Sequence, residues 1–240
     1  MRALLALAVP ALLLLGCASA PSRPEPAAGA AQLVVQFDGQ ARTGVKRAAA
    51  GSSDSYGRGQ GGSGKAFAKV DYSSIDDVIV LIDRTTVAAP AVAELELDRD
   101  GFARAQYLAS AAGGGPARLV IHNDTGAEAH VVGFSDEQGF EVSIAPGARA
   151  EVNVAAPGAY ELTCDEVENA ATIVHVTTCR SWQGESEDEA FFDDLEPGLC
   201  HVTVLAPRLP VVHRTVELAA GRRQTVVAPL TVNTLPRAGK

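Results

Sequence analysis

The chain has 240 residues, of which 47% are hydrophobic, 5% aromatic and 20% charged, and its 20 basic against 29 acidic residues give a formal net charge of −9. An acidic chain without a basic cluster is not expected to bind nucleic acid or anionic lipid surfaces, because it lacks the cations that neutralise phosphates. The charge instead predicts a soluble surface that does not adhere to polyanions.

Residues 1–16 have the form of a secretory signal, with one basic residue before an apolar run too short for a dependable membrane span. The small residue before Cys17 resembles a bacterial lipobox. This resemblance implies that Cys17 becomes the mature N-terminus and carries acyl chains such as palmitate, each buried CH₂ contributing about 0.8 kcal/mol to anchoring. Ala18 then implies sorting to the outer membrane, facing the periplasm. The alternative is an ordinary secretory signal with a chance cysteine.

Residues 17–31 are mostly small residues and prolines, a composition that predicts a flexible tether. Residues 32–84 contain two apolar strand candidates, 32–37 and 75–83, separated by a Gly/Ser-rich stretch that we expect to be a mobile loop. Residues 93–97 alternate apolar and charged side chains, which is typical of a half-buried strand.

Short apolar–polar runs separated by turn residues fill the segment 119–176, and this regular spacing predicts an all-β sandwich. One strand ends at Asn123, His130 follows a short turn, and a Gly-Tyr corner ending at Tyr160 leads to Cys164, 34 residues after His130. In order and spacing this resembles the second half of a cupredoxin, the Greek-key β-sandwich that carries mononuclear copper. The resemblance implies a cupredoxin-like domain over residues 91–177.

A blue-copper site uses two imidazoles and a thiolate, with a weak axial thioether. In the copper-binding members of the family the cysteine opens a loop of the form C-x-x-H-x-x-M. Here Val167 stands at the histidine position and Ala170 at the methionine position, and neither offers a donor atom. His130 and Cys164 are therefore interpreted as the remnant of a copper site, and we expect no cofactor.

Residues 178–235 contain a second recognisable pattern, which resembles the carboxypeptidase-regulatory, transthyretin-like module. The family pattern L-x-P-G-x-Y-x-L-x-V is matched from Leu195 onwards, with Cys200 at the tyrosine position. Such modules begin with two further strands, which we expect to come from residues 32–84. The same order resembles exported plastocyanin-like or methylamine-utilisation-like bacterial proteins. The expected fold is thus a cupredoxin-like sandwich plus a small Ig-like, transthyretin-like sandwich.

Three cysteines remain besides Cys17, and export to an oxidising compartment favours one disulfide and one leftover thiol. The preferred pair is Cys179 with Cys200, and the competing pair is Cys164 with Cys179.

The chain offers few signs of an enzyme, since it has no G-x-S-x-G nucleophile elbow and no paired histidines at zinc spacing. We expect a non-catalytic, membrane-anchored lipoprotein of the cell envelope that serves as a structural or binding module for an envelope protein or a glycan. Trp182 is a candidate for stacking on a sugar. The alternative function is a periplasmic electron carrier whose copper is held by His130, Cys164 and one unexpected donor, the candidates being His122, Glu166 and Glu168.

Overall fold

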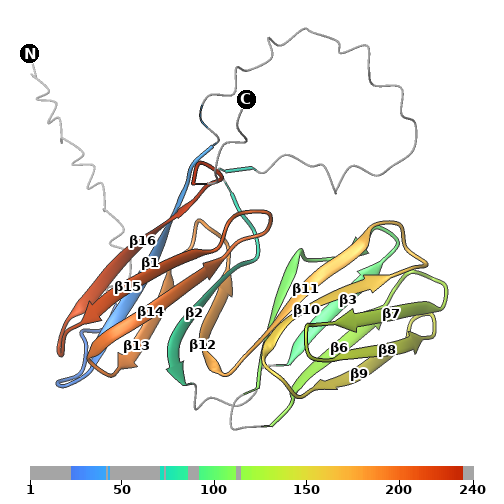
Figure 1. Cartoon of the computed structure of the whole chain (residues 1–240), viewed down its shortest axis with the longest axis horizontal. Coiled ribbons are helices and arrows are strands. Elements are labelled where there is room, and N and C mark those ends of the chain that lie inside the picture. The colour runs from blue at the N-terminus through green and yellow to red at the C-terminus, as the bar shows by residue number, and fades with distance from the viewer. Residues whose placement is uncertain are drawn as a thin grey trace, which may run out of the picture.

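Every regular element that the structure describes is a β-strand, so the predicted all-β class is confirmed (Figure 1). The computed structural model describes residues 23–41, 43, 71–72, 74–85, 92–111 and 115–234. The expected signal, Cys17, the tether up to residue 22 and nearly all of the Gly/Ser-rich loop lie outside these residues. Among the described residues no helix is long and apolar enough to span a membrane.

The strands divide into an N-terminal and C-terminal set and a central set. The first set comprises β1 (Ala31–Gly39), β2 (Val78–Thr85), β12 (Cys179–Gly184), β13 (Ala190–Leu195), β14 (Gly198–Leu205), β15 (Val212–Leu218) and β16 (Arg223–Leu230). The second set comprises β3 (Ala93–Asp98), β4 (Gly101–Phe102), β5 (Gln106–Ser110), β6 (Ala117–Asn123), β7 (Ala129–Phe134), β8 (Gly139–Ile144), β9 (Arg149–Val154), β10 (Gly158–Cys164) and β11 (Ala170–Thr177).

The central set forms a sandwich, here called the central sandwich. One sheet has the order β5-β11-β10-β7-β8 and the other the order β4-β3-β6-β9. Buried and exposed side chains alternate along β3. Ala93, Leu95 and Leu97 are buried, and the glutamates between them are exposed, so β3 has one apolar face that packs against the other sheet. Successive side chains of a strand point to opposite faces, so one face of each sheet supplies a single apolar core.

The remaining strands form the flanking sandwich, with sheets β13-β1-β16 and β12-β2-β14-β15. β1 lies between β13 and β16, and β2 lies between β12 and β14, so two strands from the start of the chain complete sheets made by its end. The apolar faces of both sheets form a second core that includes Leu33, Val80 and Val202. Trp182 stacks on Phe37 with ring centroids 5.6 Å apart and packs against this core, so it is a packing residue.

The two sandwiches lie side by side and are joined directly by the chain (Figure 1). Only Thr178 separates β11 from β12, and the Cys179 amide donates to the Thr177 hydroxyl at 3.0 Å across this corner. Gln183 on β12 then holds the edge strand β5: its amide nitrogen donates to the Gln106 carbonyl at 3.0 Å, and its oxygen accepts from the Leu108 amide at 3.1 Å. The flanking sandwich thereby covers the edge of the central sheet at β5, which would otherwise be open to pairing.

The predicted disulfide between Cys179 and Cys200 is not formed, and Cys164, Cys179 and Cys200 are all free thiols. Cys179 pairs with the end of β2 from one side, while β14, which carries Cys200, pairs with β2 from the other. Two strand spacings of about 4.8 Å therefore separate them, beyond the range that a disulfide bridges. The competing partner Cys164 lies at the opposite end of β11 from Cys179, since it pairs with Ala170.

Candidate functional site

Cys164 lies on the inner face of its sheet, in the core of the central sandwich. It is 4% exposed and pairs with Val131 of β7, which is fully buried. The thiol donates to the Glu166 carboxylate at 3.2 Å. Burial, and then this carboxylate, raise the pKa of the Cys164 thiol. Because the thiolate is the form that binds metals, this environment disfavours Cys164 as a ligand.

His130 lies on the outer face of the same sheet. It immediately precedes the buried Val131, so its side chain points away from the core. Its ring is held by the neighbouring strand β8: Nε2 lies 2.5 Å from Glu141 Oε1, and Nδ1 lies 3.1 Å from Ser143 Oγ. The sheet therefore separates the imidazole of His130 from the thiol of Cys164.

The other positions of the expected copper loop are apolar and packed. Val167 and Ala170 are 7% and 4% exposed and belong to the core. The Glu166 carboxylate accepts from both the Cys164 thiol and the His130 backbone amide, the latter at 2.9 Å, and this bond lowers the pKa of Glu166. The structure thus brings His130 and Cys164 to one carboxylate, without placing the ring beside the thiol.

The alternative donors do not complete a site either. His122 lies in the other sheet, between the buried Ile121 and Asn123, and is paired with Glu96 and Arg149 on the outer face. Glu168 is exposed in the turn after Cys164. Within the described ranges no group of three His, Cys, Asp or Glu residues is arranged to hold a metal ion. The residues present do not fit the copper centre that the resemblance implies.

The frame around the expected site is nevertheless well ordered by buried polar groups. Asn123 is fully buried, and its amide donates to the carbonyls of Ala127 and Ile144 at 2.7 and 2.8 Å. Its oxygen accepts from the amide and hydroxyl of Thr125. The Tyr160 hydroxyl donates to a backbone carbonyl four residues upstream at 3.0 Å, which fixes the corner before β10.

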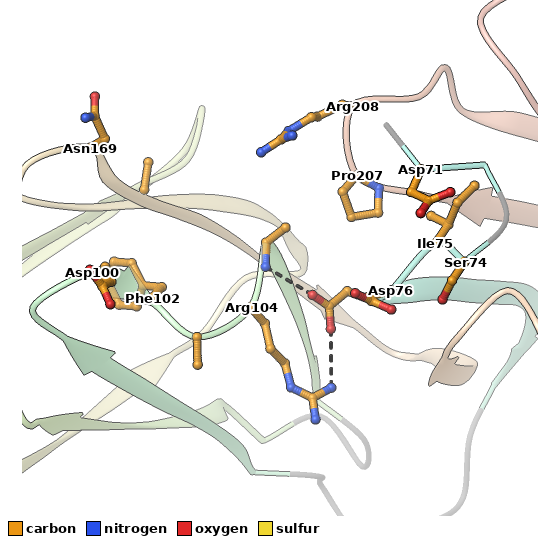
Figure 2. A pocket seen from close by; sticks show the side chains of 15 residues that line it. Asp71, Ser74, Ile75, Asp76, Asp100, Phe102, Arg104, Asn169, Pro207 and Arg208 are labelled. Atoms are coloured by element: carbon orange, nitrogen blue, oxygen red, sulfur yellow. Dashed lines mark hydrogen bonds and ion pairs between the residues drawn. The ribbon is translucent and has the colours of Figure 1, made fainter. Parts of the chain in front are cut away.

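A second candidate site lies between the two sandwiches and was not predicted from the sequence. This interdomain cavity has a volume of about 540 Å³. One wall comes from Asp71 and residues 74–77, and another from residues 100–105 and the turn at Asn169. Arg208 extends over the cavity from the loop between β14 and β15 (Figure 2). Its four aspartates and two arginines give it a polar, charged lining.

Asp77 anchors the floor of this cavity and joins the sandwiches. Its carboxylate accepts from the Ala105 amide at 3.1 Å and lies 3.4 Å from the Arg104 guanidinium, as the dashed lines in Figure 2 show. Its carbonyl accepts from the Gln106 side chain at 2.5 Å. Burial raises the pKa of Asp77, although these donors oppose the shift.

Gln106 extends this network toward a second histidine. Its amide nitrogen also donates to the Leu205 carbonyl at 3.1 Å, and its oxygen lies 3.3 Å from Nε2 of His175. Burial lowers the pKa of His175. Five hydrogen bonds through two glutamines and an aspartate thus fix the sandwiches against each other beside the cavity.

The cavity is lined by backbone in an unusual conformation. Among the described residues four non-glycine positions have positive φ, and three of them, Asp77, Asn169 and Arg208, line this cavity with φ of 59°, 60° and 62°. Left-handed residues other than glycine are uncommon and persist where the surrounding structure requires them, often at ligand sites.

No family model matches the chain, and no curated protein matches it. Among solved structures, a purple cupredoxin from Nitrosopumilus maritimus is 14% identical, covering 35% of this chain and 99% of that protein, with a TM-score of 0.31. Auracyanin B is 15% identical over 41% of this chain and 97% of its own, with a TM-score of 0.30.

A copper-containing nitrite reductase from Thermus scotoductus SA-01 is 13% identical, covering 38% of this chain and 23% of that enzyme, with a TM-score of 0.32. Similarities of this size assign no function to the chain, so function has to be argued from the site.

Proposed function

We propose that this chain is a non-catalytic lipoprotein of the cell envelope whose cupredoxin-like sandwich has lost the standard copper site and acts as a structural or binding module. The observation that carries this proposal is the placement of His130 and Cys164 on opposite faces of one sheet. A mononuclear centre needs its donors on one side of the backbone, within bonding distance of a single ion.

The chemistry at each position supports the same conclusion. Burial and Glu166 raise the pKa of the Cys164 thiol, which disfavours the metal-binding thiolate, and the His130 ring contacts two side chains of β8. Val167 and Ala170 contribute packing instead of donor atoms. Anchoring through acylated Cys17, with the protein on the periplasmic side of the outer membrane, is the part of the proposal that the sequence motif supports.

Copper loading of the mature, reduced protein tests the first part. The protein is incubated with Cu(II) and dialysed, and bound metal is then measured together with the thiolate-to-copper charge-transfer band in the visible spectrum. We expect no retained copper and no band. Stoichiometric copper with an intense band would instead support the alternative, an electron carrier with a non-standard ligand set.

Mass spectrometry of the N-terminal peptide tests the anchor. An acylated Cys17 in the membrane fraction is expected, and the Cys17→Ala variant should lose both the acyl mass and the membrane association. A wild-type peptide with unmodified Cys17, or cleavage at another position, would contradict the lipoprotein assignment.

A further inference from the structure

We propose that the interdomain cavity is a binding site for amino acids or short peptides that carry both an ammonium and a carboxylate group. The proposal rests on the charged lining that Asp71, Asp76, Asp100 and Arg208 bring together from separate segments of the chain. The proposal rests on the binding role proposed above and gives it a ligand class. It uses no residue of the expected copper site, and only Asn169 in the turn after Cys164 also lines the cavity.

The cavity has a size and a position typical of ligand sites. Its volume of about 540 Å³ lies within the range of roughly 300–1,000 Å³ that small-molecule pockets occupy. Pockets of this kind occur preferentially at domain interfaces. The hydrogen bonds of Asp77, Gln106 and Gln183 hold both walls in place, so that little ordering would be needed when a ligand binds.

The charges of the lining select the ligand. The lining carries four carboxylates against two guanidinium groups, so its formal charge is negative. Beside the ion pair of Asp77 with Arg104 it contains Asp71, Asp76, Asp100 and Arg208. Asp71 and Asp76 lie on one wall, Asp100 on the opposite wall, and Arg208 reaches toward the space between them (Figure 2). A cleft with excess negative charge attracts ammonium groups, and a guanidinium matches the geometry of a carboxylate.

Asp71, Asp100 and Arg208 already have contacts with other residues, so a ligand would exchange with or add to these contacts. Uncharged sugars fit the lining less well. Phe102 is the aromatic residue of the cavity, and it is only 7% exposed, so it offers no open face for stacking.

Arg208 stands where the local backbone favours glycine. The Leu209 amide donates to the Ala206 carbonyl at 3.1 Å, closing a turn with Pro207 second and Arg208 third, and Arg208 has φ of 62°. Proline second and a positive φ third are the features of a type II turn, whose third position prefers glycine or asparagine. An arginine at this position costs stability, and the proposal assigns its side chain a role in ligand binding.

Isothermal titration of the mature protein with the tripeptide Lys-Ala-Ala, free at both termini, tests the proposal. Saturable binding is expected, with clearly weaker binding of the same peptide when its amines are acetylated and its carboxylate is amidated. Glucose, as an uncharged polar probe, is expected to give no heat of binding. Absence of saturable binding up to about 10 mM, where ΔG would be only about −2.7 kcal/mol, would overturn the proposal, as would equal binding of the blocked peptide or of glucose.

Two variants locate the site. Arg208→Gly should weaken peptide binding by about tenfold or more, since a hydrogen-bonded charge is lost, while raising Tm by about 2–4 °C through relief of the turn. Asp76→Asn should weaken it about threefold to tenfold. Asp136→Asn removes the same charge from an exposed loop outside the cavity and should leave binding within about twofold. If Arg208→Gly folds and binds like Asp136→Asn, the assigned site is wrong, whatever the copper experiment gives.

Discussion

Restoring the two missing donors of the copper loop is expected not to restore copper. The double variant Val167→His/Ala170→Met recreates the spacing C-x-x-H-x-x-M after Cys164. A loop-only explanation of the lost site predicts that this variant binds copper. The structure predicts that it does not, because His130 stays on the far face of the sheet from Cys164.

The free-energy cost of moving His130 to the face of Cys164 can be worked out from the contacts that β7 would lose. Bringing the imidazole to the thiol requires β7 to turn over, which exposes Val131 and Ala129, both 0% exposed in the folded chain. Exposing the valine costs about 1.5–3 kcal/mol. Losing the two hydrogen bonds of the His130 ring costs about 1 kcal/mol each. The sum, about 3.5–5 kcal/mol, weakens copper binding by about 10²–10⁴-fold.

The assay combines metal analysis after dialysis with the visible charge-transfer band, and folding of the variant is checked by thermal unfolding, since both new side chains enter the core. The control adds His130→Ala to the double variant. We expect this third change to leave any residual copper binding unaltered. Stoichiometric copper with an intense band that His130→Ala abolishes would refute the placement of the two donors on opposite faces.

Three further measurements test the packing. Asn123→Ala should lower the free energy of unfolding by about 2–4 kcal/mol in urea titrations, because buried carbonyls and the Thr125 amide lose their partner, whereas the exposed Asn153→Ala should change it by less than about 0.5 kcal/mol. Burial lowers the pKa of His175 in the folded chain, so as the pH falls through 6.5 the unfolded chain takes up a proton before the folded chain does. The free energy of unfolding should therefore decrease on acidification. The His175→Gln variant should lack the part of this decrease that His175 causes. In the folded protein a disulfide reagent should label Cys179 rapidly and Cys164 and Cys200 slowly, because the latter two are buried and burial raises the pKa of Cys200 to about 11. After unfolding, all three described thiols should be labelled. Labelling of a single thiol after unfolding would indicate a disulfide.

The alternating pattern was sufficient to locate most strands, and it failed where a strand is buried on both faces or on neither. β3 alternates strictly and was predicted within one residue at its end. β5 is not predicted because its residues are buried on both faces. Tyr107 and Ala109 belong to the core of the central sandwich, and on the other face the buried Gln106 side chain is bonded to carbonyls of the flanking sandwich. β12 was missed because all its residues are half-buried, which leaves no period of two to read.

The all-β class and the absence of donor atoms at Val167 and Ala170 can be read from the amino-acid sequence alone, because they follow from local patterning and residue identity. The face on which His130 lies depends instead on how distant strands pair. Residues 129–132 are apolar on both sides of the strand apart from the histidine, so the pattern fits either orientation, and the pairing of Val131 with Cys164 selects one. The interdomain cavity depends still more on tertiary structure, because segments far apart in the chain meet there only when β2 and β14 pair and the two sandwiches dock.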